Sequence, residues 1–378
     1  MMGCRVCRSG DIRTIYQSPA PSITSLTTTL PTPTSVFACP ACGHAQSNDL
    51  PEASAFYDTA YRISLDTEDH DQIITDRHGQ PVFRTELQTQ LVLALLDPQP
   101  GQKILDFGAA KAATLKRIVA KRKDVEAFVF DVSDDYRPAW HGWLDETHCA
   151  TYTVPPHWIG TFDAITAHFV IEHVADPVET LSFLRSLLKQ GGRLFVTVPS
   201  VLANPGDLLV VDHLSHFSPA SLERALNLAG FGTVDVEDDG PLPAALLAIA
   251  SNTPSTSGVV QAQNFSAIEA VAANWSAARS RLRREREAHL GRKAAIFGAG
   301  FYGTWIASVL MPLDDVLCFV DNNPHLQSQT RFGRPVILPR DMPDDIEVIY
   351  VGLNPSHSRQ VIERCRPHLR ADLQWVWL

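Results

Sequence analysis

Residues 104–118 read ILDFGAAKAATLKRI, and this stretch decides the fold of the central part of the chain. A short apolar strand leads through Asp106 to Gly108, and a helix follows. That order is typical of the first strand, turn and helix of an α/β sheet that binds a ligand at its carboxyl edge. Ala110 and Ala112 stand where glycine is common, and they disfavour positive φ angles. Taken alone, the stretch could also be an ordinary strand–turn–helix corner.

Strands and helices alternate from residue 101 to 255. The predicted strands read KILDFG, VEAFVFDVS, FDAITAHFV and GRLFVTVPS. One helix between them, PVETLSFLRSLLKQGG, has Pro177 in its first turn and Gly191 as its expected left-handed cap. This alternation predicts a parallel, doubly wound sheet. Asp131 ends the second strand, where such sheets place an acid that contacts ribose hydroxyls.

Two C-x-x-C pairs lie in residues 1–50, on either side of a stretch rich in Ser, Thr and Pro. Each such turn supplies two thiolates, and two turns complete a tetrahedral zinc site. Four protein ligands leave no open position, so we predict a structural zinc-binding module. The predicted ligands are Cys4, Cys7, Cys39 and Cys42. Redox-active or coincidental pairs remain alternatives, as does His44 in place of one cysteine.

Residues 291–378 begin again with a strand and a glycine-rich turn, which predicts a second, smaller Rossmann-like α/β domain. The turn is a complete G-x-G-x-x-G, and Asp321 ends the next strand. Three interpretations stay open: a dinucleotide site, a site for the nucleotide end of a sugar-nucleotide substrate, or glycines that only permit close packing. The residues concerned are Gly298, Gly300, Tyr302, Gly303 and Asp321.

Charge and composition exclude some classes of function. The chain has 378 residues, 45% of them hydrophobic, and a net charge of −10. Nucleic-acid binding requires a basic surface, so we expect no nucleic-acid partner. No stretch is apolar enough for a transmembrane helix, and the first residues lack the apolar region of a secretory signal. We therefore expect a cytoplasmic protein; its oligomeric state is left open.

Two longer stretches carry a family resemblance. Residues 162–200 contain V-I-E-H-V-A-D-P followed by L-L-K-Q-G-G-R-L-F-V-T-V-P, and residues 210–231 read VVDHLSHFSPASLERALNLAGF. In order and spacing they resemble class I methyltransferases that depend on S-adenosylmethionine (SAM). The resemblance implies that residues 101–255 form the methyltransferase domain. It also implies that the cofactor contacts are Asp106, Gly108, Ala110, Asp131 and His168.

The order of the parts resembles the bacterial deoxysugar C-methyltransferases, which methylate a carbon of a nucleotide-linked keto sugar. That family combines a zinc module, a methyltransferase domain and a C-terminal Rossmann-like domain. The resemblance implies that residues 51–100 are a helical linker on the substrate side and residues 256–290 a helical connector. It further implies a base that removes the proton beside the sugar ketone, and an enolate whose carbon takes the methyl group.

Family members carry a Tyr-x-Glu-His segment that here reads Val210-Val211-Asp212-His213, so the histidine is kept and the tyrosine is absent. We expect His213 to be the general base, oriented by Asp212. The catalytic candidates are His213, Asp212, His216, His173 and Tyr61. Tyr57 is expected to contact the substrate. Methylation of oxygen or nitrogen, an additional NAD site in the C-terminal domain, and a catalytically inactive binding protein remain alternatives.

Overall fold

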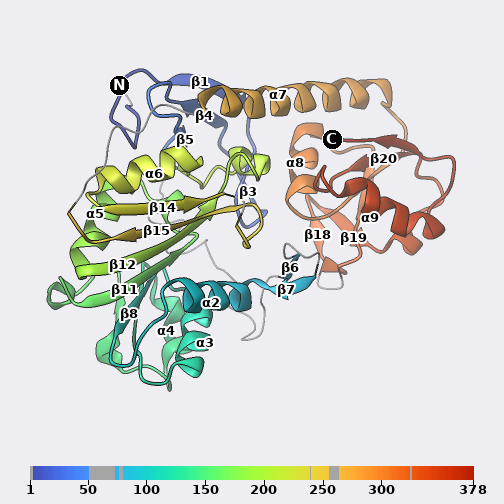
Figure 1. Ribbon diagram of the computed structural model, residues 1–378. Coiled ribbons are helices and arrows are strands. Elements are labelled where there is room, and N and C mark those ends of the chain that lie inside the picture. The colour runs from blue at the N-terminus through green and yellow to red at the C-terminus, as the bar shows by residue number, and fades with distance from the viewer. Residues whose placement is uncertain (1–2, 51–72, 76–79, 239, 255–263, 324–325) are drawn as a thin grey trace. The chain divides into compact units, whose positions relative to one another are not determined.

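The computed structural model forms two compact units, each described here by itself (Figure 1). The described residues are 3–50, 73–75, 80–238, 240–254, 264–323 and 326–378. The first unit comprises Met1–Ile15, Val36–Leu208 and Asp212–Glu269. The second comprises Tyr16–Ser35, Leu209–Val211 and Ala270–Leu378.

A seven-stranded sheet is the centre of the first unit. Its strands, in spatial order, are β10 (Cys149–Thr151), β9 (Glu126–Asp131), β8 (Lys103–Phe107), β11 (Phe162–His168), β12 (Leu188–Pro199), β15 (Ala245–Ser251) and β14 (Thr233–Glu237). The first five are parallel, and β15 runs antiparallel to both of its neighbours. The predicted class I methyltransferase sheet is thereby confirmed.

Among the described residues, this unit contains the helices α2 (Arg84–Leu95), α3 (Ala113–Lys121), α4 (Arg137–Trp140), α5 (Pro177–Leu187) and α6 (Pro219–Leu228), and the first residues of α7. Side-chain caps begin two of them, α5 and α6. Helix α5 begins where the Asp176 side chain accepts from the Glu179 N–H. A reciprocal capping box between Ser218 and Ser221 begins α6.

The predicted end of α5 was wrong. The helix ends at Leu187 and β12 begins at Leu188, so Gly191, with φ of +78°, lies in a strand. The reason is a long-range contact from the end of β15. The Asn252 side chain donates to the carbonyls of Leu188 and Lys189, at 3.1 and 3.0 Å, and its own carbonyl accepts from the Gly191 N–H.

A small sheet joins the cysteine-containing segment to the loop that follows β12. Its order is β1 (Arg13–Ser18), β4 (Thr34–Ala38), β5 (Ala45–Ser47) and β13 (Ser215–His216). Strands β5 and β13 are antiparallel, with His216 opposite Ala45. The segment after β12 is therefore held by backbone hydrogen bonds to the N-terminal module.

The second unit contains a six-stranded sheet, which confirms a second α/β sheet domain in the C-terminal part of the chain. Its strands, in spatial order, are β18 (Thr330–Arg331), β19 (Arg334–Ile337), β17 (Val316–Val320), β16 (Ala294–Phe297), β20 (Val348–Val351) and β21 (Gln374–Val376). Helices α8 (Phe301–Leu310) and α9 (Ser358–Cys365) belong to it, as does most of α7 (Phe265–Ala288). Among the helices of the described residues, none combines the length and apolarity that crossing a bilayer requires.

Close backbone packing explains two of the three glycines in the turn after β16. A Cβ on Gly303 would lie 1.9 Å from the carbonyl oxygen of Gly298, and one on Gly298 would lie 2.3 Å from that of Gly352. A Cβ on Gly300 would meet nothing within 4 Å. The first and third glycines are thus required by the fold itself, whether or not a nucleotide binds.

We expect Gly303→Ala to destabilise the second unit by about 3 kcal/mol, because the new methyl group overlaps backbone that cannot rotate away. The matched variant Gly300→Ala should cost less than about 1 kcal/mol, since its Cβ enters open space. Hydrogen exchange of β16 and α8 in each variant measures the difference. Equal protection in the two variants would contradict the packing explanation.

Candidate active site

The expected cofactor residues lie at one edge of the seven-stranded sheet. Asp106 on β8, Asp131 at the end of β9 and His168 at the end of β11 come from neighbouring parallel strands. Asp106 is in register with Thr166 of β11 on one side and Val129 of β9 on the other. Parallel sheets bind ligands beyond this carboxyl edge, so these residues are where a cofactor would lie.

The loop after β8 keeps a glycine-like path although two alanines stand in it. Gly108, Ala110 and Ala112 have φ angles of 73°, 45° and 54°, all left-handed. The Ala112 methyl group is buried in the core with 1% exposure, so it does not project toward a ligand. A left-handed backbone conformation costs a non-glycine residue about 1–2 kcal/mol, and favourable contacts with the surrounding structure must offset that cost.

A hydrogen bond from the loop to Asp131 is one of those contacts. The Ala110 N–H donates to Asp131 Oδ2 at 2.8 Å, and the Ser133 N–H donates to Oδ1 at 3.2 Å. Asp106 is also buried: Thr166 Oγ1 donates to its carboxylate at 2.8 Å, and its burial, together with the charge of Asp131, raises its pKa to about 7. Both oxygens of Asp131 thus accept from backbone N–H groups of the two loops at this edge.

His168 offers a polar atom without a protein partner at this edge. Its Nδ1 is 3.2 Å from Thr197 Oγ1, while its buried Nε2 has no hydrogen-bond partner among the described residues. Burial lowers the pKa of His168 to about 3, so the imidazole is neutral at pH 7. Buried polar groups are almost always satisfied, so this atom fits the polar group of a bound molecule.

A second group of side chains surrounds the carboxylate of Asp207, which lies on the 3₁₀ turn η6 (Pro205–Leu209). His213 Nδ1 is 2.5 Å from Asp207 Oδ1, and His216 Nδ1 is 2.9 Å from Asp207 Oδ2. All three side chains are buried. Since a carboxylate oxygen accepts, both Nδ1 atoms carry a hydrogen.

This carboxylate changes the charge of His213. Burial opposes protonation of the imidazole, but the Asp207 carboxylate outweighs that effect and raises the pKa of His213 to about 9. The same pairing holds the pKa of Asp207 far below its ordinary value, although burial acts in the opposite direction. Asp207 was not among the residues expected from the sequence, since no spacing rule links an aspartate in one loop to a histidine in the next.

Asp212, the expected partner of His213, contacts a different histidine. Its main-chain oxygen lies 2.9 Å from His173 Nδ1, and its carboxylate lies 3.8 Å from the same atom. The rings of His173 and His213 are 4.8 Å apart and nearly perpendicular. Burial lowers the pKa of His173 to about 4, so His173 is neutral beside a His213 that is cationic at pH 7.

Glu172 adds a protonated carboxyl group to this cluster. It is 1% exposed, and its Oε2 has no hydrogen-bond partner among the described residues. Burial raises the pKa of Glu172 to about 8. Glu172 and His173 both lie on the 3₁₀ turn η5 (Ile171–His173), directly after Val170, whose side chain covers Gly108 of the cofactor loop. The histidine cluster and the cofactor edge are therefore adjacent.

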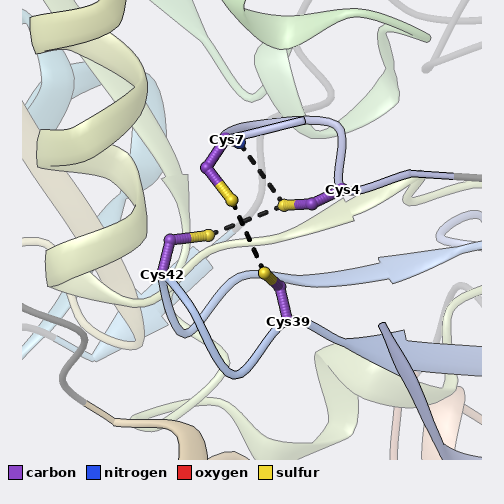
Figure 2. Close-up of side chains that lie close together, drawn as sticks. All are labelled: Cys4, Cys7, Cys39 and Cys42. Carbon is purple, nitrogen blue, oxygen red and sulfur yellow. Dashed lines mark hydrogen bonds between the residues drawn. The ribbon is translucent and has the colours of Figure 1, made fainter. Parts of the chain in front are cut away.

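The four paired cysteines converge as the sequence predicts (Figure 2). The Sγ atoms of Cys4 and Cys42 are 3.6 Å apart, and those of Cys7 and Cys39 are 3.5 Å apart. One candidate ligand atom from each residue lies within 4.8 Å of all the others. Four thiol sulfurs at these separations fit the tetrahedron that Zn²⁺ prefers. The group could therefore hold a metal ion.

The two cysteine turns have the same backbone geometry. The N–H of Arg8 donates to the carbonyl of Cys4 at 3.0 Å, and the N–H of Gly43 donates to that of Cys39 at 2.8 Å. Arg8 and Gly43 both have left-handed φ angles, 63° and 67°. The glycine after the second pair thus has the conformational role expected of it, and an arginine takes the same conformation after the first.

Charged side chains of this module contact the segment after η5. Arg5, which is buried, donates to the carbonyls of Ala175 at 2.6 Å and Ser47 at 3.2 Å. Arg8 pairs with Asp176, the residue that caps α5. The module therefore holds both loops that carry the histidine cluster, one through these arginines and the other through β13.

The remaining residues expected at a site are two tyrosines of the substrate-side segment and two residues of the second unit. Tyr57 and Tyr61 lie outside the described residues. Tyr302 stacks on Trp275, with ring centroids 6.1 Å apart, and burial raises its pKa. Asp321 accepts hydrogen bonds from the N–H groups of Ala299 and Asn323, both at 2.8 Å.

Residues 80–236 match a family model described as "Methyltransferase domain". The match spans β8 to β12 and most of β14, together with η5, η6 and β13, which carry the histidine cluster. The match identifies this part of the chain as a methyltransferase domain and supports a SAM-dependent methyltransferase. No curated protein sequence matches the chain.

Several solved structures are similar to part of the chain. The CurJ carbon methyltransferase is 18% identical with a TM-score of 0.37, over 45% of this chain and 54% of that one. SAM-dependent methyltransferases from Mesorhizobium loti and Archaeoglobus fulgidus are each 16% identical, with TM-scores of 0.35 and 0.36. Those matches cover 42% and 45% of this chain and 95% of each of the others.

The two loop alanines should respond differently to glycine. Ala110→Gly relieves left-handed strain of about 1–2 kcal/mol and adds about 0.5–1 kcal/mol of unfolded-state entropy, so it should be neutral or slightly stabilising. Ala112→Gly has the same backbone effects but also removes a buried methyl group worth about 0.8 kcal/mol. We therefore expect Ala112→Gly to be the less stable by about 1 kcal/mol. Thermal melts of the two variants check the order, and a reversed order would contradict it.

Proposed function

We propose that the protein transfers a methyl group from SAM to a sugar, a nucleotide-linked keto sugar, and that it does so at carbon through an enolate. The match to a methyltransferase domain supports the transfer of a methyl group. The choice of a sugar as the substrate rests on the resemblance of the three-part chain to the deoxysugar C-methyltransferases. Transfer to a hydroxyl or amine of a sugar or other small molecule is the alternative within the same class.

The observation that carries the proposal is His213 held by a buried carboxylate beside the cofactor edge. A carbon next to a ketone must lose a proton before it can accept a methyl group, and histidine is the side chain best suited to take it. In its neutral form, His213 keeps the hydrogen on Nδ1 toward Asp207 and the lone pair on Nε2. We propose that Nε2 is the general base.

The cofactor supplies an electrophilic methyl group when bound. The residues proposed to hold it are those of the carboxyl edge: Asp106, Gly108, Ala110, Asp131 and His168. Asp131 would accept from the ribose hydroxyls, and the unpartnered Nε2 of His168 is available to a polar group of the cofactor. The left-handed loop between them brings backbone close to the ligand, as such loops do.

The four cysteines are proposed to bind one structural Zn²⁺. A closed set of four protein ligands leaves no position for substrate, so the metal would hold the module together instead of taking part in the reaction. The glycine-rich turn of the second unit is proposed to bind a nucleotide at Gly300, where the backbone is open.

The proposal predicts that the protein binds SAM and transfers its methyl group to nucleotide-linked keto sugars. His213→Gln should lower the rate by about 100-fold or more, the usual contribution of a general base, while the calorimetric affinity for SAM stays within a factor of about two. Radiolabelled SAM and a panel of such sugars provide the assay. Transfer to hydroxyl-only sugars at full rate would move the proposal to O-methylation.

Calorimetry with SAM and a separate fluorescence titration with NADH test the remaining alternatives. No heat with millimolar SAM would favour a catalytically inactive binding protein. Fluorescence enhancement of NADH that disappears in Gly300→Val would add a nicotinamide site in the second unit.

Purified protein should contain about one zinc per chain. Cys39→Ser should lose that zinc and unfold the N-terminal module, because metal binding and folding of such small modules are coupled. Cys149→Ser is the matched control, since this cysteine lies outside the group and should leave the zinc content unchanged. Elemental analysis of both variants decides, and zinc retained in Cys39→Ser would contradict the assignment.

A further inference from the structure

The carboxylate of Asp207 is an unusual feature of the site. It is 1% exposed, and each of its oxygens accepts a hydrogen bond from a different imidazole. A buried carboxylate is stable only when a cation or several donors compensate its charge. Here the two histidines do so, and their rings are thereby held in fixed orientations.

His216 has a supporting position in this arrangement. It is 0% exposed, with Nδ1 bonded to Asp207 and Nε2 lying 2.9 Å from Ser47 Oγ. Both ring nitrogens are thus used within the protein, and a substrate cannot reach either. Among the candidates from the sequence, this separates His216 from His213.

Ser47 connects these hydrogen bonds to the cysteine module. It ends β5, which pairs with β13 and follows the turn of Cys39 and Cys42 directly. Gln46, beside Ser47, accepts from the Arg5 N–H at 2.8 Å, within the other cysteine turn. The hydrogen-bonded series Ser47, His216, Asp207 and His213 therefore begins on a segment that the cysteine turns hold.

We propose that Asp207 is the positioning residue of the general base and that the series from Ser47 through His216 to Asp207 aligns His213 from the cysteine module. This inference rests on the proposed function, because it assigns a role to the base named there. The carboxylate fixes the hydrogen on Nδ1 of His213 and stabilises the imidazolium that forms when Nε2 accepts a proton. His216 and Ser47 hold the carboxylate in place.

The proposal has a consequence for pH dependence. His213 is a base only when neutral, so the rate should rise with pH through its pKa of about 9. Other titratable groups face the same imidazole from η5, η6, β13 and its own loop. They are Glu172, His173, Asp207, Asp212 and His216. Asp207 is the largest of the influences that raise the pKa of His213.

The test is Asp207→Asn, measured as kcat/KM against pH from 5.5 to 10, with Asp235→Asn as the matched control on the exposed face of β14. The amide cannot stabilise the imidazolium, so the rising limb should move from about 9 toward the ordinary histidine value of about 6.5, while the plateau falls by about 100-fold. Asp235→Asn should reproduce the wild-type profile. A uniformly lower rate with an unmoved limb would overturn the proposal.

A second measurement is independent of methyl transfer. Nuclear magnetic resonance of histidine-labelled protein gives the pKa of His213 without any substrate, and the same downward movement is expected in Asp207→Asn. Ser47→Ala is a milder variant that should move it less, in the same direction. An unchanged His213 pKa overturns this proposal and leaves the proposed function intact, whereas absence of any methyl transfer in wild type overturns the function alone.

Metal analysis tests one further alternative, in which His213 and its neighbours bind a metal ion. Glu172, His173 and His213 offer candidate ligand atoms within 4.8 Å of one another. We expect no metal beyond that of the cysteines. A second metal per chain that disappears in Glu172→Gln would overturn the proposal, because a histidine bound to a metal through Nε2 cannot accept a proton there.

Discussion

A single buried carboxylate organises the part of the first unit where the reaction is proposed to occur. Asp207 lies between two imidazoles, and it can remain charged there only because they donate to it. Each imidazole is in turn part of a separate element, one on the loop before β13 and one on β13 itself. The orientation of both histidines therefore depends on one side chain and on the elements that hold it in place.

The cysteine turns are among those elements. They contact both loops that carry the histidine cluster: one through the β5–β13 ladder, the other through Arg5 and Arg8 at Ala175 and Asp176. A loop rich in polar side chains loses much conformational entropy when it is ordered. Contacts with the N-terminal module, whose four cysteines are proposed to bind one zinc, reduce that cost. The N-terminal segment therefore has a role even though the seven-stranded sheet is complete without it.

Local signals were enough to predict the sheet, the beginning of α5 and the cysteine group, because strand periodicity, helix starts and C-x-x-C turns are set by a few neighbouring residues. Contacts between distant segments were not predictable in this way. Asp207 and His213 meet through two irregular loops, and Asn252, directly after β15, contacts the backbone where α5 ends. The alanines of the cofactor loop also differ from expectation, since they accept the glycine-like backbone that their type disfavours.

The two sheets repeat one detail that changes how the sequence should be interpreted. Asp131 accepts from the N–H of Ala110, in the loop after β8, and from the N–H two residues further on, at Ser133. Asp321 makes the same pair of contacts in the second unit, with Ala299 and Asn323. An acid at the end of the second strand thus stabilises the first loop by itself. Its presence therefore predicts this local geometry and is weaker evidence for a ribose. The nucleotide role of each unit depends instead on other atoms: the buried, unpartnered Nε2 of His168 in the first unit and the open backbone at Gly300 in the second.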